Sequence, residues 1–297
     1  MIRTENLTKR YRHNEALHDL TLEVPRGSVF ALVGPNGAGK TTAIKVFMNL
    51  IRPSAGRAEV FGIDSTRLGP AELAQIGYVS ENQKLPQWMR VDYFLEYCRA
   101  FYPSWDGALA AELTSHYELP LDRRLSALSR GMKVKAALAA SLAYRPRLVV
   151  LDEPFSGLDV LVRDQLIESI VDCTPQATVL LASHDLAEIE SFATHVCYLN
   201  EGRLEFVEEM GDLTTRFREI EVTLEVPSAL PSGLPATWLD PEQSGVVVRF
   251  TDTRYEAARS REEVTRQFAG VREIHSRQMS FRAIFLALAK SRRIQCA

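Results

Sequence analysis

The sequence predicts an α/β fold in which helices cover a parallel β-sheet, with an inserted helical subdomain and a small second domain of α+β type. An apolar run at residues 29–33 leads into a glycine-rich segment and then a helical pattern. Nearly continuous apolar runs at 148–151 and 177–182 are separated by another helical pattern, which is typical of strands buried on both faces. After about residue 213 this alternation stops, so residues 1–212 and 213–297 are predicted to be separate domains.

Hydrophobic periodicity places the elements of the larger domain. Strands are predicted at residues 2–10, 17–24, 58–61 and 77–79, in addition to the three apolar runs. Helical spacing of apolar residues recurs at 43–50, 91–101, 107–117, 132–143 and 160–173. Because three of these helical segments are consecutive, residues of about 85–144 are predicted to form a helical subdomain inserted between strands.

The second domain is predicted from a different mixture of patterns. Strands are expected at residues 219–226, 245–251 and 271–276, and helices at 259–268 and 280–289. Ser280 is the predicted N-cap of the last helix. The segment 227–244 contains four prolines and is predicted to be a loop.

Residues 34–42 read G-P-N-G-A-G-K-T-T and match the phosphate-binding pattern G-x-x-x-x-G-K-[ST], with a strand before it and a helix after it. Backbone N–H groups and the positive end of a helix dipole surround one point there, which suits a nucleoside triphosphate. Lys40 is expected to reach the β- and γ-phosphates, and the Thr41 hydroxyl to hold Mg²⁺. The predicted nucleotide-binding residues of this loop are Gly34, Asn36, Gly37, Gly39, Lys40, Thr41 and Thr42.

A second part of a triphosphate site follows the apolar strand at 148–151, which ends in Asp152-Glu153-Pro154. A carboxylate at a strand end downstream of a phosphate-binding loop can hold Mg²⁺ through its water shell, and we assign this role to Asp152. Glu153 could then polarise the attacking water. The alternative for both residues is a solvent-exposed pair at a strand end.

Three more motifs make the pattern specific. Leu128-Ser129-Arg130-Gly131-Met132-Lys133 precedes the carboxylate strand, Ser156-Gly157-Leu158-Asp159 follows it, and Ser183-His184-Asp185 follows the next strand. In this order, over roughly residues 1–210, the motifs resemble the ATP-binding subunit of an ATP-binding cassette (ABC) transporter of the bacterial drug- and antibiotic-export type. The resemblance implies a P-loop ABC ATPase core that uses ATP and Mg²⁺.

The resemblance also implies a role for each matched residue. Tyr11 would stack on adenine, and Glu81 would contact Mg²⁺ and couple to the membrane subunit. Glu153 would be the catalytic base, and His184 would lie near the γ-phosphate. The remaining matches concern the subunit interface: Ser129 and Gly131 would bind the γ-phosphate of the opposite subunit's ATP, and Asp159 belongs to the D-loop.

Two residues depart from the family pattern. Arg130 stands where the signature usually has its first glycine, and Glu81 stands where the family has glutamine. Arg130 could add a charge-assisted contact to phosphate or point away from it. Gln83 lies two residues after Glu81, so it offers an alternative alignment.

The resemblance implies a cytoplasmic subunit that hydrolyses ATP at the inner face of the membrane, through separate permease subunits. It would pair with itself or with a paralogue, and export is the preferred direction. The alternative is a soluble regulatory ABC ATPase that is not coupled to transport. No apolar run approaches the 18 residues of a membrane helix, so direct membrane insertion is not expected.

Charge and cysteine content exclude other classes. The formal net charge of -3 argues against a general nucleic-acid binder, which would usually show a basic surface. The four cysteines, Cys98, Cys173, Cys197 and Cys296, are scattered without a C-x-x-C pair. No zinc site or disulfide framework is therefore expected.

Overall fold

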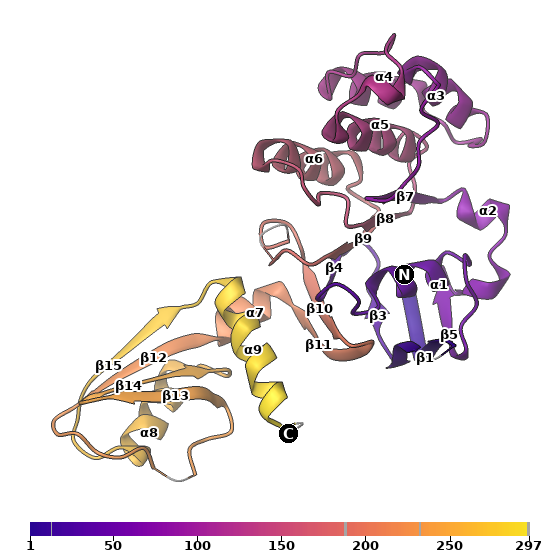
Figure 1. Cartoon of the computed structure of the whole chain (residues 1–297). Helices are drawn as coiled ribbons and strands as arrows, with labels where there is room; N and C mark the ends of the chain where they lie inside the picture. The colour runs from indigo at the N-terminus through magenta and orange to yellow at the C-terminus, as the bar shows by residue number, and fades with distance from the viewer. Residues whose placement is uncertain (13, 187–188, 232, 296–297) are drawn as a thin grey trace. The chain divides into compact units, whose positions relative to one another are not determined.

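The computed structural model describes residues 1–12, 14–186, 189–231 and 233–295 (Figure 1). It divides into two compact units, Met1–Val207 and Glu208–Ala297. The division falls a few residues before the boundary that the sequence pattern predicts. Cys296 lies outside the described residues.

A six-stranded sheet forms the centre of the first unit, with strand order β11-β10-β4-β9-β8-β7. Its strands are β4 (Val29–Val33), β7 (Ile76–Ser80), β8 (Leu148–Asp152), β9 (Thr178–Ser183), β10 (His195–Asn200) and β11 (Arg203–Glu209). The pairs from β10 to β7 are all parallel, and every residue of β8 and β9 is buried. The predicted parallel sheet is confirmed, whereas β10 and β11 were not foreseen.

A second, antiparallel sheet has the order β2-β1-β5-β6, and β3 also pairs with β1. Its strands are β1 (Ile2–Tyr11), β2 (Asn14–Leu20), β3 (Glu23–Val24), β5 (Ala55–Val60) and β6 (Ile63–Asp64). The prediction of one strand over residues 17–24 was wrong, because β2 and β3 are separate. At the break, the Leu22 N–H donates to the Thr4 hydroxyl at 2.9 Å, so a side chain replaces a backbone partner.

One hydrophobic core joins the two sheets through helix α1 (Lys40–Phe47). Ile44 and Phe47 of the helix are buried there with Phe30 of β4 and Val60 of β5. Burying such side chains contributes about 1.5–3 kcal/mol each. This packing therefore holds the start of α1, and the glycine-rich loop before it, in a defined position.

The helical subdomain contains α3 (Val91–Arg99), α4 (Gly107–His116) and α5 (Arg130–Leu142), which lie together in Figure 1. Helix α6 (Val160–Cys173) follows β8, and the short helix α2 (Pro70–Leu73) precedes β7. Two 3₁₀ turns cover Ser65–Arg67 and Leu125–Ala127. Helix α5 packs against β7, which connects the subdomain to the central sheet.

The second unit is an antiparallel sheet with order β13-β14-β12-β15 and three helices among its described residues. Its elements are α7 (Met210–Arg216), β12 (Arg218–Leu224), β13 (Trp238–Ser244), β14 (Val247–Asp252), α8 (Ala257–Gln267), β15 (Val271–Gln278) and α9 (Phe281–Gln295). Trp238 stacks on Phe250 with ring centroids 4.0 Å apart, inside a core that includes Val264 of α8. Before α9, the Ser280 hydroxyl accepts a hydrogen bond from the Ala283 N–H at 3.3 Å.

The prediction of a loop over residues 227–244 was wrong at its carboxyl end, where β13 forms. The strand lies at the sheet edge and contains Pro241, which has no N–H to donate. The register shifts between Leu239 and Glu242, and Asp240 has a φ of 48°. The proline therefore falls in a bulge of an edge strand, where a missing donor costs little.

Candidate functional site

The predicted catalytic motifs meet at one edge of the parallel sheet. The glycine-rich loop follows β4, Glu153 follows β8, and His184 follows β9. Strands β4, β9 and β8 are neighbours in the sheet, so their carboxyl ends lie side by side. This edge is where open parallel sheets bind ligands.

The loop has a shape that only certain residues permit. Gly39 has a φ of 102°, and a Cβ there would lie 2.5 Å from the Ala16 carbonyl oxygen. Any larger residue would therefore be strained and would clash. Asn36 and Gly37 are exposed, whereas Gly34 and Lys40 are buried and Thr42 is half-buried. The loop thus keeps its outer part open to a ligand.

Lys40 opens α1, and its side chain bends back over the loop. Its Nζ donates to the carbonyl oxygens of Gly34 at 2.6 Å and Pro35 at 3.3 Å. It also lies 3.0 Å from Oε1 of Glu153. The lysine is only 5% exposed, so its charge acts on this site with little screening by water.

Glu153 lies between Lys40 and His184. Its Oε2 is 2.6 Å from Nδ1 of His184, so the carboxylate is held on both oxygens. The Glu153 side chain is 14% exposed and the His184 side chain 44% exposed. Glu153 has a φ of 54°, and its N–H donates to the Ala182 carbonyl oxygen on β9 at 3.0 Å. Left-handed backbone at a residue other than glycine is found disproportionately at functional sites.

Thr41 and Asp152 form a second pair of contacting side chains at this sheet edge, beside Lys40 and Glu153. The Thr41 hydroxyl donates to Oδ1 of Asp152 at 2.9 Å. Asp152 is 3% exposed, and this burial raises the pKa of its carboxyl group; the Thr41 hydrogen bond opposes the shift and the charge of Glu153 adds to it. A desolvated carboxylate beside a hydroxyl fits a bound divalent cation.

A magnesium ion at this position would need the triphosphate as well. Within the described residues, no group of three or more His, Cys, Asp or Glu side chains could hold a metal. Mg²⁺ commonly binds through one or two carboxylates, waters and substrate phosphates. Thr41 and Asp152 fit that arrangement, with the nucleotide supplying the remaining oxygens.

The Asp152→Asn substitution is expected to stabilise the nucleotide-free protein and to abolish its response to magnesium. The raised pKa means that ionised Asp152 opposes folding as pH rises from about 3.8 through its folded pKa, and this cost is present at neutral pH. The amide of the variant still accepts a hydrogen bond from Thr41 but carries no charge. Thermal unfolding at pH 7 should shift up by a few degrees, while Mg²⁺ with ATP should stabilise only the wild type. A lower midpoint for the variant would contradict this interpretation.

Ser129, Gly131 and Asp159 lie in a second group rather than with Lys40. They line a cavity of about 260 Å³ together with Gly157. Ser129 is the N-cap of α5, and its Oγ accepts from the Met132 N–H at 3.2 Å. Asp159 caps α6 in the same way, accepting from the Val162 N–H at 3.0 Å. Two helix starts therefore face this cavity.

The two residues that depart from the family pattern contact each other. Nη2 of Arg130 lies 2.6 Å from Oε1 of Glu81, although the residues are 49 positions apart. Their side chains are 50% and 31% exposed. Ion pairs as exposed as this contribute about 0–1 kcal/mol to stability. The sequence pattern marked both residues but did not predict that they would pair.

Tyr11 lies at the end of β1 and is 44% exposed. The Lys9 ammonium is 5.1 Å from the ring centroid, which is a cation–π contact. An aromatic ring with an accessible face is compatible with the predicted stacking on adenine, which stays a prediction.

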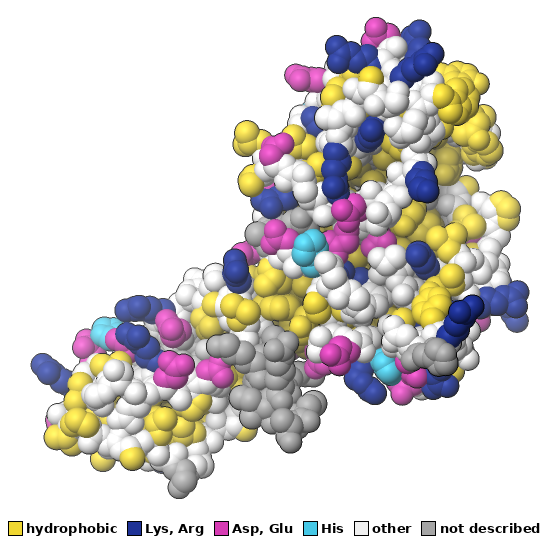
Figure 2. Space-filling model, in the orientation of Figure 1, with side chains coloured by type: hydrophobic (Ala, Val, Ile, Leu, Met, Phe, Trp, Pro, Cys, Tyr) yellow, Lys and Arg dark blue, Asp and Glu magenta, His cyan; other side chains and the backbone are white. Residues whose placement is uncertain are grey.

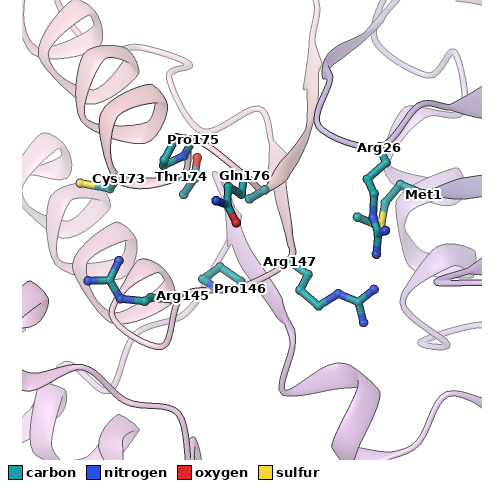
Figure 3. A pocket seen from close by; sticks show the side chains of 10 residues that line it. Met1, Arg26, Arg145, Pro146, Arg147, Cys173, Thr174, Pro175 and Gln176 are labelled. Atoms are coloured by element: carbon teal, nitrogen blue, oxygen red, sulfur yellow. The ribbon is translucent and has the colours of Figure 1, made fainter.

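A larger cavity, of about 590 Å³, lies elsewhere (Figure 3). It is lined by residues that precede β8 and β9, so it is at the amino ends of these strands. Figure 3 shows Arg145 on the same side as Cys173, and Arg147 nearer to Arg26 and Met1. The three guanidinium groups are thus spread along the cavity and do not converge as a phosphate site would require.

Comparison with known proteins agrees with the motifs. Residues 17–156 match the family described as ABC transporter. The daunorubicin/doxorubicin resistance ATP-binding protein DrrA of Streptomyces peucetius is 31% identical, over 97% of this chain and 92% of its own length. This chain belongs to the ABC transporter ATP-binding proteins. Members of this family bind and hydrolyse ATP, form dimers and work with membrane permeases.

Other relatives cover less of this ABC protein. A sulfate/thiosulfate import ATP-binding protein of Nephroselmis olivacea is 33% identical over 68% of this chain and 61% of its own length. Among solved structures, an ATP-binding subunit of an ABC transporter is similar with a TM-score of 0.65 and 28% identity, covering 72% of this chain and 91% of that chain. The predicted ABC ATPase fold is therefore confirmed.

Proposed function

We propose that this chain is the ATP-hydrolysing subunit that powers a separate membrane permease, and that the transporter is an exporter. The observation that carries the hydrolytic part is the Glu153 carboxylate, held between Lys40 and His184 beside the Thr41–Asp152 pair. The proposed base, the histidine that orients it, the lysine that binds the phosphates and the residues that would bind Mg²⁺ thus lie at one edge of the sheet.

Glu153 is the proposed general base for hydrolysis. It takes a proton from the water that attacks the γ-phosphorus; the bond to the bridging oxygen breaks, and ADP and phosphate leave. His184 orients the carboxylate through its 2.6 Å contact. Lys40 is drawn from Glu153 to the phosphates when ATP enters, which releases Glu153 toward the water. Mg²⁺, when bound by Thr41 and Asp152 through its coordination shell, neutralises phosphate charge.

The active form is proposed to be a pair of cassettes with two ATP molecules between them. In one chain, Lys40 lies beside Glu153, whereas Ser129 lines the separate cavity that also contains Gly131 and Asp159. Each chain has one copy of both sites. The helix start at Ser129 presents backbone N–H groups, a usual phosphate-binding arrangement. In the pair, Ser129, Gly131 and Asp159 of one chain meet the ATP held by Lys40 of the other.

The proposed contact with the permease is the groove between the central sheet and the helical subdomain. This groove, of about 340 Å³, is lined by Tyr78 of β7, Phe94 of α3 and Ala137 of α5, among others. Hydrophobic side chains also gather over α3 in Figure 2. The exposed aromatic residues of α3 and its flanking segments are 47% to 65% exposed, namely Trp88, Tyr93, Tyr97 and Phe101. An exposed aromatic surface of this kind is typical of a protein contact.

We propose that the permease is a separate chain. None of the described helices has the length and apolar character required to cross a membrane. We propose that the permease holds this protein at the inner face of the membrane.

Export is favoured by the share of this chain that each relative matches. The resistance protein DrrA matches 97% of this chain, which includes the second unit, whereas the sulfate import protein matches 68%. The second unit is thus shared with a protein named for drug resistance. We infer that the cargo belongs to the class of amphipathic toxic compounds.

Deleting the gene is expected to raise cellular accumulation of such a compound, with daunorubicin as the first probe. Wild-type protein should restore low accumulation, and the Lys40→Ala protein should not, although it is made in equal amount. Unchanged accumulation across a panel of amphipathic drugs, with ATPase activity intact, would favour the regulatory alternative. Lost uptake of a nutrient would reverse the proposed direction.

A further inference from the structure

Arg130 and Glu81 place a full charge at two positions where the family pattern has an uncharged residue. The structure joins them at 2.6 Å, between the loop that follows β7 and the first residue of α5. Two unusual charges of opposite sign at contact distance are more simply explained together than separately.

The guanidinium of Arg130 is also held against Gly157. A Cβ built on Gly157 would be 3.2 Å from Nη1 of Arg130, which is a tight contact, and the φ of 70° already favours glycine there. Arg130 also lines the cavity that contains Ser129 and Gly131. The side chain therefore lies at the wall of the proposed phosphate site, in contact with both neighbouring loops.

Helix stability does not explain a cation at this position. Arg130 is the first residue of α5, at the positive end of the helix dipole, where cations are unfavourable. The first turn has no acidic residue to offset it. Such an end favours an anion, and arginine can bind phosphate oxygens through two parallel N–H bonds.

We propose that Arg130 is an exchangeable phosphate-binding residue, held by Glu81 in the single cassette and transferred to the γ-phosphate of the partner's ATP in the pair. The inference rests on the proposed function, because it requires the paired cassettes. The exposed ion pair is weak enough to be exchanged for a multiply charged phosphate. The exchange releases the Glu81 carboxylate, so pairing at one ATP site is coupled to the loop after β7.

The test is the dissociation constant of the ATP-bound pair, measured by analytical ultracentrifugation of the full chain. A Glu153→Gln background prevents hydrolysis during the run. Adding Glu81→Gln should tighten pairing about tenfold, because Arg130 then binds phosphate without first breaking an ion pair with a carboxylate. Adding Arg130→Gly should weaken pairing about tenfold. The double variant should match Arg130→Gly alone, since the gain from Glu81→Gln requires Arg130.

Glu5→Gln is the matched control. Glu5 pairs with Arg57 at 2.9 Å, with side chains 35% and 56% exposed, and with Arg3 at 3.2 Å. The substitution therefore removes exposed ion pairs away from both phosphate groups. It should leave pairing unchanged, and thermal unfolding should be similar for all variants. If Glu81→Gln weakens pairing or has no effect, the exchange is overturned. If the background protein does not pair with ATP at all, the proposed function fails, and the exchange fails with it.

Discussion

Replacing Lys40 by alanine is expected to reduce ATP hydrolysis by at least about 10²–10³-fold, the loss seen when one electrostatic stabiliser of a transition state is removed. Lys40 is 5% exposed and is the only residue whose ammonium joins the loop carbonyls to Glu153 in the described structure. ATP binding should weaken as well, because the same ammonium is placed to meet the phosphates. Steady-state phosphate release and nucleotide titration measure the two effects.

The same substitution should lower stability, because it leaves the Glu153 carboxylate 14% exposed without its lysine. Breaking a buried ion pair in this way costs about 2–3 kcal/mol when one other partner, here His184, remains. Thermal unfolding should therefore shift down by about 5 °C. Adding Glu153→Gln to Lys40→Ala removes the unpaired charge, so it should restore most of the stability and none of the activity.

Lys45→Ala is the matched control, since Lys45 lies on α1 but is exposed. It should leave hydrolysis within a factor of about two, and unfolding within about 0.5 kcal/mol. Activity that survives in Lys40→Ala at more than a tenth of the wild-type rate would contradict the assignment of this lysine.

Replacing Glu153 by glutamine is expected to lower the rate of hydrolysis by about 10²–10⁴-fold while leaving ATP binding intact. Glutamine has nearly the same shape and can keep an oxygen toward Lys40, but it cannot take a proton from water. The Glu153→Gln protein should therefore accumulate as an ATP-bound pair, detected by gel filtration with ATP and Mg²⁺. Single-turnover hydrolysis separates the chemical step from binding.

His184→Ala gives the comparison for this variant. His184 orients the Glu153 carboxylate at 2.6 Å and does not replace it as a base, so its removal should cost less than Glu153→Gln. Its ATP-bound pair should also be short-lived, because Glu153 is still present. An equal or larger loss in His184→Ala would indicate that the histidine, and not Glu153, carries the main catalytic role.

The local sequence predicted much of the larger domain. A continuous apolar run such as residues 148–151 predicts a strand of a sheet that is covered on both faces. Polar residues that follow such a run then lie at the carboxyl end of the strand. The lysine of the loop and the carboxylates at the end of β8 could therefore be assigned to one triphosphate site, and the family resemblance added the histidine after β9. No local pattern could predict the distances between these side chains, such as 2.6 Å between Glu153 and His184.

The misplaced elements show where local patterns fail. Strand β13 contains Pro241, and this proline and the polar residues around it predict a loop. Burial of Trp238 against Phe250 and an edge position outweigh that preference. The break between β2 and β3 depends on the Thr4 hydroxyl, which is far along the chain from Leu22. Both outcomes were decided by contacts between distant segments.

Sequence alone was enough to predict a triphosphate site with its loop residues and to identify the family, because phosphate-binding loops and strand-end carboxylates are contiguous patterns set by backbone geometry. It also marked Arg130 and Glu81 as unusual, one at a time. Only the folded chain showed that they form one ion pair over Gly157. The pairing joins residues 49 positions apart, and it depends on how α5 packs against β7, which no local pattern encodes.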